Sequence, residues 1–363
     1  MTALAVALEV TDPVSVAAAG AGAQDVTVLI NNAGAAVGAT SSPKSTPTST
    51  PTSTPATNQP ADTSAEGRQP DMPSQEPRPT IHIAGTNTHT LAPRTGHHGR
   101  EGTLRYLKAG TGAPLVLLHT VRTQAEHYRL LIPLIAEHYT VYALDLPGMG
   151  YSEIVPGASY DEPAMRSGVE RLLTELDLRD VTLVGESMGA VLALTAAADL
   201  PERVRRVVAV NAYDFPGGIA RSSLLARVVV SGVLAPGVGP VIAGVEPKPA
   251  LTKIFQGGLG DKSALREDYV DELLQVGRRP GYPTVARGVY QALPSLIAAR
   301  ERYPEVKAPI HLVYGEKDWS RPSDREANRK LLPTADFTQV AKAGHFIALE
   351  RPEVLADLLN AVA

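Results

Sequence analysis

Short apolar runs rich in β-branched residues recur along the C-terminal part of the chain, separated by longer segments of mixed polarity. Runs that are apolar on both faces are typical of strands in a buried parallel sheet, because helices cover both sides of such a sheet. We therefore predict strands at residues 114–120, 139–146, 181–186, 204–212 and 309–315.

The segments between these runs have the spacing of apolar residues that is typical of helices. This spacing predicts helices over about residues 123–137, 161–177, 188–199, 322–332 and 352–362. A regular alternation of strand and helix indicates a doubly wound, mostly parallel sheet with helices on both faces. The predicted fold class is therefore α/β.

Residues 216–300 interrupt this alternation with helical and loop sequence, which indicates an insertion after the strand that ends near Asn211. Within the insertion, residues 224–245 are mostly apolar and about as long as a membrane span. Arg227 and a central group of prolines and glycines interrupt that run, and a helix exposed to lipid would leave backbone groups unpaired there. We expect apolar helices that cover a pocket, and no membrane partner.

A stretch rich in Ser, Thr and Pro divides the chain. Such sequence has almost nothing to bury, and repeated proline disfavours both helix and sheet, so residues 38–80 are predicted to be a disordered linker. A short head, residues 1–37, precedes it. We predict that the rest of the chain forms an α/β core from residues 81–215 and 301–363 and a helical cap from residues 216–300.

Composition excludes several classes of function. The 363 residues include 34 basic and 38 acidic side chains with a formal net charge of −4, so no strongly basic field exists to hold nucleic acid. The absence of cysteine excludes disulfides and thiolate metal sites, and no metal or cofactor is expected. The first residues lack the positive region of a signal peptide, which favours a cytoplasmic location.

The most specific chemical motif is Gly-Glu-Ser-Met-Gly at residues 185–189. It fits the pattern G-x-S-x-G and lies directly after a predicted strand and directly before a predicted helix. In that setting the serine occupies a tight turn above the sheet, and the flanking glycines avoid clashes between strand and helix. The pattern predicts Ser187 as a nucleophile; the alternative is that Ser187 only caps the helix.

A serine nucleophile needs a base and a carboxylate that orients this base. His345 lies in a Gly-His loop ahead of the final predicted helix and comes last in the order nucleophile, acid, base. Asp318 follows a predicted strand between Ser187 and His345, so it is the preferred acid. Asp214, at the end of the preceding strand, is the main rival, and Glu316 is a weaker candidate.

Attack by the serine places negative charge on a substrate oxygen, which backbone N–H groups must stabilise. One donor is expected at Met188, because it follows the nucleophile and begins a helix whose N-terminus favours negative charge. The other is expected in the loop after the strand at 114–120, at Thr120 or Val121.

The segments LLHT, DLPGMGYS, GESMGA, GEKDW and AGHF occur in this order along the chain. With this set of motifs, residues 100–363 resemble the α/β-hydrolase fold superfamily, in a form that carries a cap. The resemblance implies an eight-stranded sheet with the cap inserted after the sixth strand, and residues 216–300 fit that cap. One departure is Thr120, which stands where the family commonly has glycine and brings a side chain close to the oxyanion loop.

Four further residues beside these motifs are candidates for the substrate pocket: His119, Arg122, Trp319 and Phe346. Arg122, just beyond the oxyanion loop, is a candidate to meet an anionic group of the substrate. The alternative is an arginine that is solvated or held in a salt bridge.

The superfamily includes haloalkane dehalogenases and epoxide hydrolases, which displace a group at an sp³ carbon through an aspartate. A serine would leave an unreactive ether there, so Ser187 indicates acyl chemistry instead. For the same reason, no epoxide-activating role is expected of the cap tyrosines Tyr269, Tyr282 and Tyr290. We expect hydrolysis of a small-molecule carboxylic ester or lactone.

Other activities fit the same residues. Carbon–carbon bond hydrolases of vinylogous diketone acids resemble this chain in the Ser-Met-Gly motif and the lid, and Arg122 is then a candidate to bind the acid group. A perhydrolase or haloperoxidase-like activity is a further alternative, because peroxide can replace water at an acyl-enzyme. The last alternative is a non-catalytic protein that binds a ligand in the same cavity.

Residues 7–34 of the head resemble a fragment of a short-chain dehydrogenase/reductase, through LEVTDPVSV and Asn-Asn-Ala-Gly. The Gly-rich phosphate turn that should precede this fragment is absent, and the linker replaces the catalytic residues that should follow it. The fragment is therefore predicted to have no function, and no nicotinamide cofactor is expected.

Overall fold

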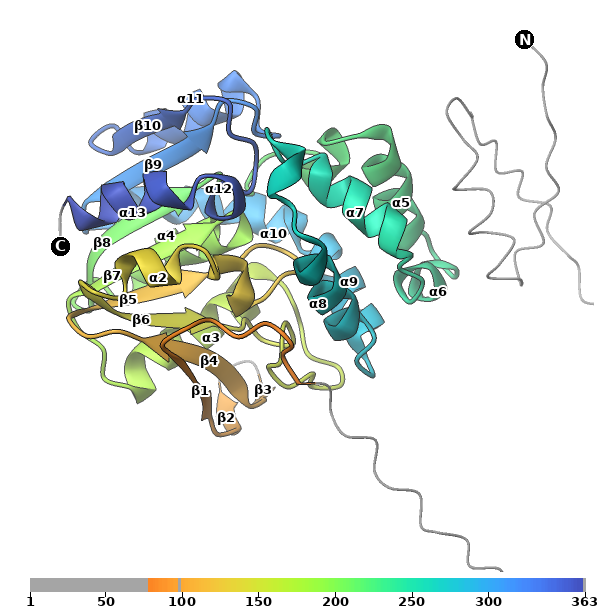
Figure 1. The fold of residues 1–363 in the computed structure, drawn as a ribbon, viewed down its shortest axis with the longest axis horizontal. Helices are drawn as coiled ribbons and strands as arrows, with labels where there is room; N and C mark the ends of the chain where they lie inside the picture. Colours follow the sequence, from red (N-terminus) through yellow and green to blue (C-terminus); the bar gives the residue numbers. More distant parts are fainter. Residues whose placement is uncertain (1–77, 97–98, 362–363) are drawn as a thin grey trace, which may run out of the picture. The chain divides into compact units, whose positions relative to one another are not determined.

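A computed structural model of the chain describes residues 78–96 and 99–361. The head, the dehydrogenase-like fragment and the linker as far as residue 77 lie outside the described residues, so their assignments stay predictions. In Figure 1 the described part consists of a central sheet flanked by helices, with a further group of helices beside the sheet.

The sheet has eight strands in the order β1-β4-β6-β5-β7-β8-β9-β10. The strands from β5 onward run parallel to their partners among themselves, whereas β4 is antiparallel to both β1 and β6. The doubly wound, mostly parallel α/β fold predicted from the sequence is confirmed. The strands are β1 (Thr86–Leu91), β4 (Leu104–Ala109), β5 (Ala113–Leu118), β6 (Tyr139–Leu144), β7 (Val181–Glu186), β8 (Val204–Val210), β9 (Ile310–Gly315) and β10 (Asp336–Val340), and a separate hairpin holds β2 (Arg94–Gly96) and β3 (Gly99–Glu101).

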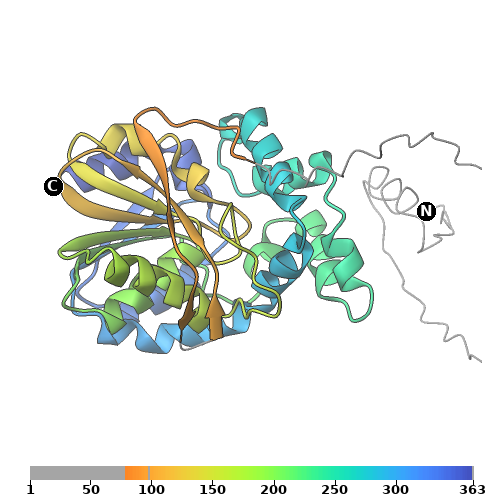
Figure 2. The same cartoon turned by 90° about the horizontal axis from the view of Figure 1, so that it is seen from below.

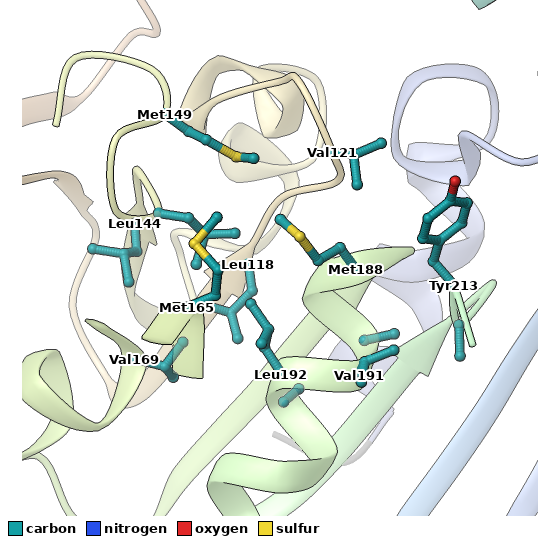
Figure 3. Close-up of a cluster of buried hydrophobic side chains, with 14 of the residues drawn as sticks. Leu118, Val121, Leu144, Met149, Met165, Val169, Met188, Val191, Leu192 and Tyr213 are labelled. Atoms are coloured by element: carbon teal, nitrogen blue, oxygen red, sulfur yellow. The ribbon is translucent and has the colours of Figure 1, made fainter. Parts of the chain in front are cut away.

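Helices cover both faces of the sheet (Figure 2). Alternate residues of β5 belong to two hydrophobic clusters, Leu115 and Leu117 to one, Val116 and Leu118 to the other. Burial of each such leucine stabilises the fold by roughly 1.5–3 kcal/mol, which explains why this strand is a continuous apolar run. The first cluster contains side chains of α2 (Ile132–Ile135), α12 (Ile347–Glu350) and α13 (Pro352–Asn360), and the second contains those of α3 (Glu162–Glu175) and α4 (Met188–Asp199), part of which Figure 3 shows.

The segment predicted to form the cap joins β8, the sixth strand of the sheet along the chain, to β9. Pro236 and Gly237 separate its first two α-helices, as the sequence suggested. No helix in the described part of the chain is both long and apolar enough to cross a membrane. The segment contains η2 (Gly218–Arg221), α5 (Leu224–Leu234), α6 (Gly239–Ala243), α7 (Lys248–Gln256), η3 (Lys262–Ala264), α8 (Glu267–Gly277), α9 (Tyr282–Gln291), α10 (Leu293–Ala298) and η4 (Ala299–Glu305).

The structure differs from the expected elements in two respects. The helix predicted over 123–137 is instead a short 3-10 turn, η1 (Ala125–Tyr128), and the single helical turn α2. Pro133 lies in the first turn of α2, because proline lacks the N–H that a helix interior needs. Strands β1, β4 and β10 were not expected; β1 is an edge strand with mostly exposed side chains, so it lacks an apolar run. The helix α11 (Pro322–Leu331) follows β9 as predicted.

Candidate active site

The G-x-S-x-G motif forms the sharp turn between β7 and α4. Ser187 has φ 61° and ψ −116°, a conformation that a residue other than glycine adopts only when its surroundings hold it there. A Cβ atom at Gly189 would lie 2.0 Å from the carbonyl oxygen of Leu118, so only glycine lets α4 cross β5 this closely. Among the described residues, Ser187 makes no side-chain capping bond to α4. Its hydroxyl is therefore available for another partner.

That partner is His345. The Ser187 hydroxyl donates to Nε2 of His345 over 2.9 Å, and Nδ1–H of His345 donates to Oδ1 of Asp318 over 2.5 Å. Burial alone would raise the pKa of Asp318, but the charge of His345 and its hydrogen bonds outweigh burial and hold this pKa below its usual value. The structure thus brings together the nucleophile, base and preferred acid that the sequence suggested.

The loop after β9 holds Asp318 in place. Its second oxygen accepts hydrogen bonds from both the backbone N–H and the hydroxyl of Ser320, and Arg325 donates to that hydroxyl over 3.0 Å. Trp319 stacks on the ring of His345, with centroids 3.8 Å apart and planes 14° apart. Trp319 therefore covers one face of the imidazole and restricts its orientation.

The rival carboxylates have other partners. Asp214 accepts hydrogen bonds from the hydroxyl of Tyr303 over 2.9 Å and from Nδ2 of Asn328 over 2.8 Å. Burial raises the pKa of Asp214 to about 6. Glu316 accepts a hydrogen bond from the backbone N–H of Lys342. Of these three carboxylates, Asp318 is the one that forms a hydrogen bond to His345.

Asn211 connects several parts of the site by hydrogen bonds. The sequence marked it only as the end of a predicted strand. Its Nδ2 donates to the carbonyl oxygens of Gly344 and His345 over 3.1 and 2.9 Å, and its Oδ1 accepts from the N–H of Gly315 over 2.9 Å. Asn211 has φ 47°, in the left-handed region that asparagine tolerates better than most residues. A single side chain thus links the ends of β8 and β9 to the histidine loop.

A buried carboxylate behind the nucleophile was also missed. Glu186 accepts a hydrogen bond from the N–H of Ala348 over 3.1 Å and pairs with Nε2 of His127. Nδ1 of His127 in turn meets the hydroxyl of Tyr269, on α8, at 3.0 Å. Tyr269 is therefore a buried residue of the cap whose hydroxyl is engaged by His127, and not a free hydroxyl in the pocket. The sequence shows Glu186 only as the variable position of its motif, which carries no signal.

Glu350 connects the histidine loop to the cap. One oxygen accepts from the N–H groups of Gly260 and Asp261 over 2.9 and 3.0 Å, and the other accepts from the N–H of Gly344. Burial raises the pKa of Glu350 although these three donors oppose the effect. In the same region the N–H of His345 donates to the carbonyl oxygen of Gly258 over 2.6 Å. The loop that carries the base is thus held directly against the cap.

The loop after β5 has the position expected of an oxyanion loop. Nδ1–H of His119 donates to the carbonyl oxygen of Thr120 over 2.8 Å, and Nε2 accepts from the N–H of Leu146 over 3.1 Å. Burial lowers the pKa of His119 to about 4, so the ring is neutral near pH 7 and can accept at Nε2. His119 therefore supports the loop, with both ring nitrogens engaged by backbone.

Both candidate donors lie in this neighbourhood. Met188 is the first residue of α4, and the first N–H groups of a helix have no partner within the helix. Val121 and Met188 belong to the same buried cluster, as Figure 3 shows together with Tyr213. The oxyanion role of Met188, Thr120 and Val121 stays a prediction.

The pocket candidates Arg122, Trp319 and Phe346 all contact the cap. Arg122 forms an ion pair with Glu246, so it takes the salt-bridged alternative rather than standing free. Nε1 of Trp319 donates to the carbonyl oxygen of Gly257 over 3.1 Å, and Phe346 packs against Phe255. The segment between β8 and β9 thus contacts the loops around the site, and Ser187 and His345 have no exposed surface.

Across residues 78–96 and 99–361, no group of three or more His, Asp or Glu side chains is placed to hold a metal ion. The side chains that the structure joins at the site are a serine, a histidine and an aspartate in a hydrogen-bonded series.

Comparison with known proteins relates the chain to hydrolases. It is 27% identical over 252 residues to the uncharacterised hydrolase YugF of Bacillus subtilis, covering 67% of this chain and 87% of that protein. It is 24% identical over 261 residues to the 2-hydroxy-6-oxo-2,4-heptadienoate hydrolase of Pseudomonas putida, covering 69% of this chain and 89% of that protein.

Solved structures share the fold at low identity. Cfl2 from Burkholderia cenocepacia matches with a TM-score of 0.65 and 22% identity, covering 76% of this chain and 95% of that one. The epoxide hydrolase CorEH matches with a TM-score of 0.63 and 22% identity, covering 76% and 98%. The model of the alpha/beta hydrolase family matches residues 115–358, which include most of β5, the strands β6 to β10, the turn at Ser187 and the segment between β8 and β9. This chain therefore belongs to the alpha/beta hydrolase family.

Proposed function

We propose that the protein is a serine hydrolase that cleaves a carboxylic ester or lactone through an acyl-enzyme on Ser187. The observation that carries this proposal is the series Ser187–His345–Asp318, with donor–acceptor distances of 2.9 and 2.5 Å. These distances allow proton transfer from the hydroxyl to the imidazole as the hydroxyl attacks.

The reaction follows from the geometry. Ser187 Oγ forms a bond to the acyl carbon while its proton moves to Nε2 of His345, and Asp318 stabilises the imidazolium. The oxyanion accepts hydrogen bonds from the N–H of Met188 and of Thr120 or Val121. The tetrahedral intermediate expels the alcohol, which takes the proton from His345. Water then loses a proton to His345 and attacks the acyl carbon, which releases the acid and restores Ser187.

Substrate entry requires movement of the cap in this proposal, because the nucleophile and base are fully buried. The contacts that would have to loosen are those between the cap and the two catalytic loops, at Arg122–Glu246 and around Gly258. Closure after binding would exclude water from the first step, which strengthens the electrostatic stabilisation of the oxyanion.

A carbon–carbon bond hydrolase is the second candidate. The observation that favours it is the likeness to 2-hydroxy-6-oxo-2,4-heptadienoate hydrolase over most of both chains. Such a reaction also needs acyl transfer, but the leaving group is a carbon acid, and the substrate carries a carboxylate. A diketone acid that is cleaved faster than activated esters would favour this candidate.

The first test is hydrolysis of 4-nitrophenyl butyrate by the purified full chain. We expect release of 4-nitrophenol that Ser187→Ala reduces by about 10⁴-fold or more, because the nucleophile is lost. A serine-directed phosphonate should add its mass to the peptide that contains Ser187. A protein that hydrolyses no activated ester and is not labelled at Ser187 is not a serine hydrolase, and ligand binding without catalysis would then be favoured.

A further inference from the structure

A buried arginine connects the oxyanion loop to the cap. The Arg122 side chain is 11% exposed, and its guanidinium forms an ion pair with Glu246, between α6 and α7. Arg122 has φ 58°, in the left-handed region that favours glycine, so its surroundings must hold its backbone there. The loop residue just beyond the candidate oxyanion donors Thr120 and Val121 is thus held by a carboxylate of the cap.

Two cap tyrosines lie near the guanidinium of Arg122. Cζ of Arg122 lies 5.6 Å from the ring centroid of Tyr282 and 6.0 Å from that of Tyr290. Burial, together with the neighbouring Tyr290, raises the pKa of Tyr213, and the Tyr213 ring lies 6.4 Å from the ring of His345. We call Arg122, Glu246, Tyr282 and Tyr290 the charge cluster; Arg122 connects it along the chain to the candidate oxyanion residues Thr120 and Val121.

The charge cluster is electrically neutral. Burial alone would lower the pKa of Arg122, but Glu246 and the two tyrosines outweigh burial and raise it, so the guanidinium stays charged. One positive and one negative side chain then cancel. A substrate carboxylate placed here would lie beside Glu246, and two like charges repel strongly where the effective dielectric constant is low. The neutral pair therefore disfavours an anion that Arg122 alone would attract.

Two buried polar atoms of the oxyanion loop and of Arg122 can still form hydrogen bonds to a ligand. Nε of Arg122 and Oγ1 of Thr120 are buried and have no hydrogen-bond partner among the described residues. Most buried polar groups in folded proteins are paired, so these two atoms are suited to meet a polar group of a ligand. A carbonyl, ether or hydroxyl oxygen accepts from Arg122 Nε–H without adding charge.

We infer that Glu246 is a specificity-determining residue: by neutralising Arg122 it makes the acyl pocket accept uncharged substrates and reject anionic ones. The preferred substrate is then a neutral ester or lactone with a second oxygen near the scissile carbonyl. This inference rests on the proposed acyl chemistry of Ser187 and adds the charge of the substrate to it.

The test compares two esters that differ only in charge. One is the mono-4-nitrophenyl ester of suberic acid, which carries a free carboxylate; the other is the same compound with that carboxylate as its methyl ester. We expect the wild-type protein to have the higher kcat/KM for the neutral ester. In Glu246→Gln the arginine is left unpaired, so the ratio of neutral to anionic kcat/KM should fall by about tenfold or more, which corresponds to about 1.4 kcal/mol.

Two further variants check this result, one with the opposite expected change and one with no expected change. In Arg122→Met the carboxylate of Glu246 loses its partner, so the preference for the neutral ester should increase instead of falling. Glu267→Gln removes a cap carboxylate whose side chain is 81% exposed and pairs with Lys248, and it should leave the ratio unchanged. Thermal melting of each variant separates a lost preference from a lost fold.

The outcomes distinguish this inference from the proposed function. A wild-type preference for the anionic ester overturns the inference, as does a Glu246→Gln ratio equal to that of Glu267→Gln. In both cases hydrolysis that depends on Ser187 still supports the proposed function. If neither ester is hydrolysed and the phosphonate does not label Ser187, the proposed function itself fails.

Discussion

Two buried aspartates near the same edge of the sheet differ in their electrostatics. Asp318 meets His345 and two donors from Ser320, and these partners hold its pKa below the usual value despite burial. Asp214 has Arg300 at 3.8 Å and accepts hydrogen bonds from Tyr303 and Asn328, but burial outweighs these partners and raises its pKa from 3.8 to about 6. Charge on Asp318 is favoured by its surroundings, whereas charge on Asp214 is opposed.

Substitution of Asp214 by asparagine should show how the raised pKa of Asp214 affects the stability of the fold. The folded pKa of Asp214 lies above the unfolded value, so protonated Asp214 stabilises the fold below about pH 4, and this contribution of about 3 kcal/mol is lost as the pH rises through about 6. Asp214→Asn has no such dependence. Its unfolding free energy minus that of the wild type should therefore rise by about 2 kcal/mol between pH 4 and pH 7, as measured by urea unfolding.

Activity gives the second readout of this variant. Asp214→Asn should keep kcat close to the wild-type value, because Asp318 still orients His345, whereas Asp318→Asn should lower kcat by about 10⁴-fold. If Asp214→Asn instead caused the large loss, the acid would be assigned to the wrong carboxylate. If the difference in unfolding free energy between Asp214→Asn and the wild type did not change over this pH range, burial would not raise the pKa of Asp214.

At the scale of elements, the crossing of β7, α4 and β5 sets the position of the nucleophile. A Cβ at Gly185 would lie 2.0 Å from the carbonyl oxygen of Gly189, and one at Gly189 would lie 2.0 Å from that of Leu118. These neighbours are backbone atoms, which cannot move without shifting a whole strand or helix. The two glycines are therefore conditions for the turn at Ser187, not only parts of a motif.

Gly189→Ala tests this close approach. The added methyl group should displace α4 from β5, which should lower the unfolding free energy by about 3 kcal/mol and reduce kcat by misplacing Ser187. The matched control is Gly232→Ala on α5, where an added Cβ meets only the side chain of Ile242, at 3.3 Å. Alanine favours a helix over glycine by about 1 kcal/mol, so the control should melt at the wild-type temperature or above it. Equal melting temperatures for both variants would contradict the argument.

The same scale shows which elements were predictable. Strands β5 to β9 appear in the sequence because they are largely buried on both faces and are therefore mostly apolar. The exposed edge strand β1 and the partly exposed β10 lack that signal and exist because a neighbouring strand pairs with them. The predicted helix at 123–137 failed for a similar reason, since buried loop contacts such as Ala125 N–H to Asp145 decide its shape.

At the scale of the whole molecule, the described body begins with a segment that is attached to the cap. The N–H of Thr80 donates to Glu272 on α8 over 2.8 Å, and its hydroxyl donates to the same carboxylate. Gln275, also on α8, donates to the carbonyl oxygen of Arg78, and Ile83 is buried. Residues 78–83 are therefore structural, although the sequence suggested a linker as far as residue 80.

Two truncations follow from these contacts. A chain that starts at Glu76 should match the full chain in melting temperature and in hydrolysis of 4-nitrophenyl butyrate, because it keeps every described contact. A chain that starts at Gly85 loses Thr80, which is one of the partners of Glu272, and the buried Ile83, so it should melt roughly 5 °C lower or more. The two thermal melts and their kcat/KM values check this. A large loss of activity in the chain that starts at Glu76 would show that the head contributes to the site.

The sequence by itself determined the fold class, the order of the buried strands β5 to β9, and the identities of Ser187, His345 and Asp318 as candidates. Those features depend on spacing along the chain and on motifs confined to a few residues, so they can be recognised without coordinates. Only the tertiary structure decided which side chains support these residues. Asn211 forms a hydrogen bond to the histidine loop, and Glu246 pairs with Arg122. These partners come from distant segments, and the apolar or polar character of a position does not record which distant side chain it will meet.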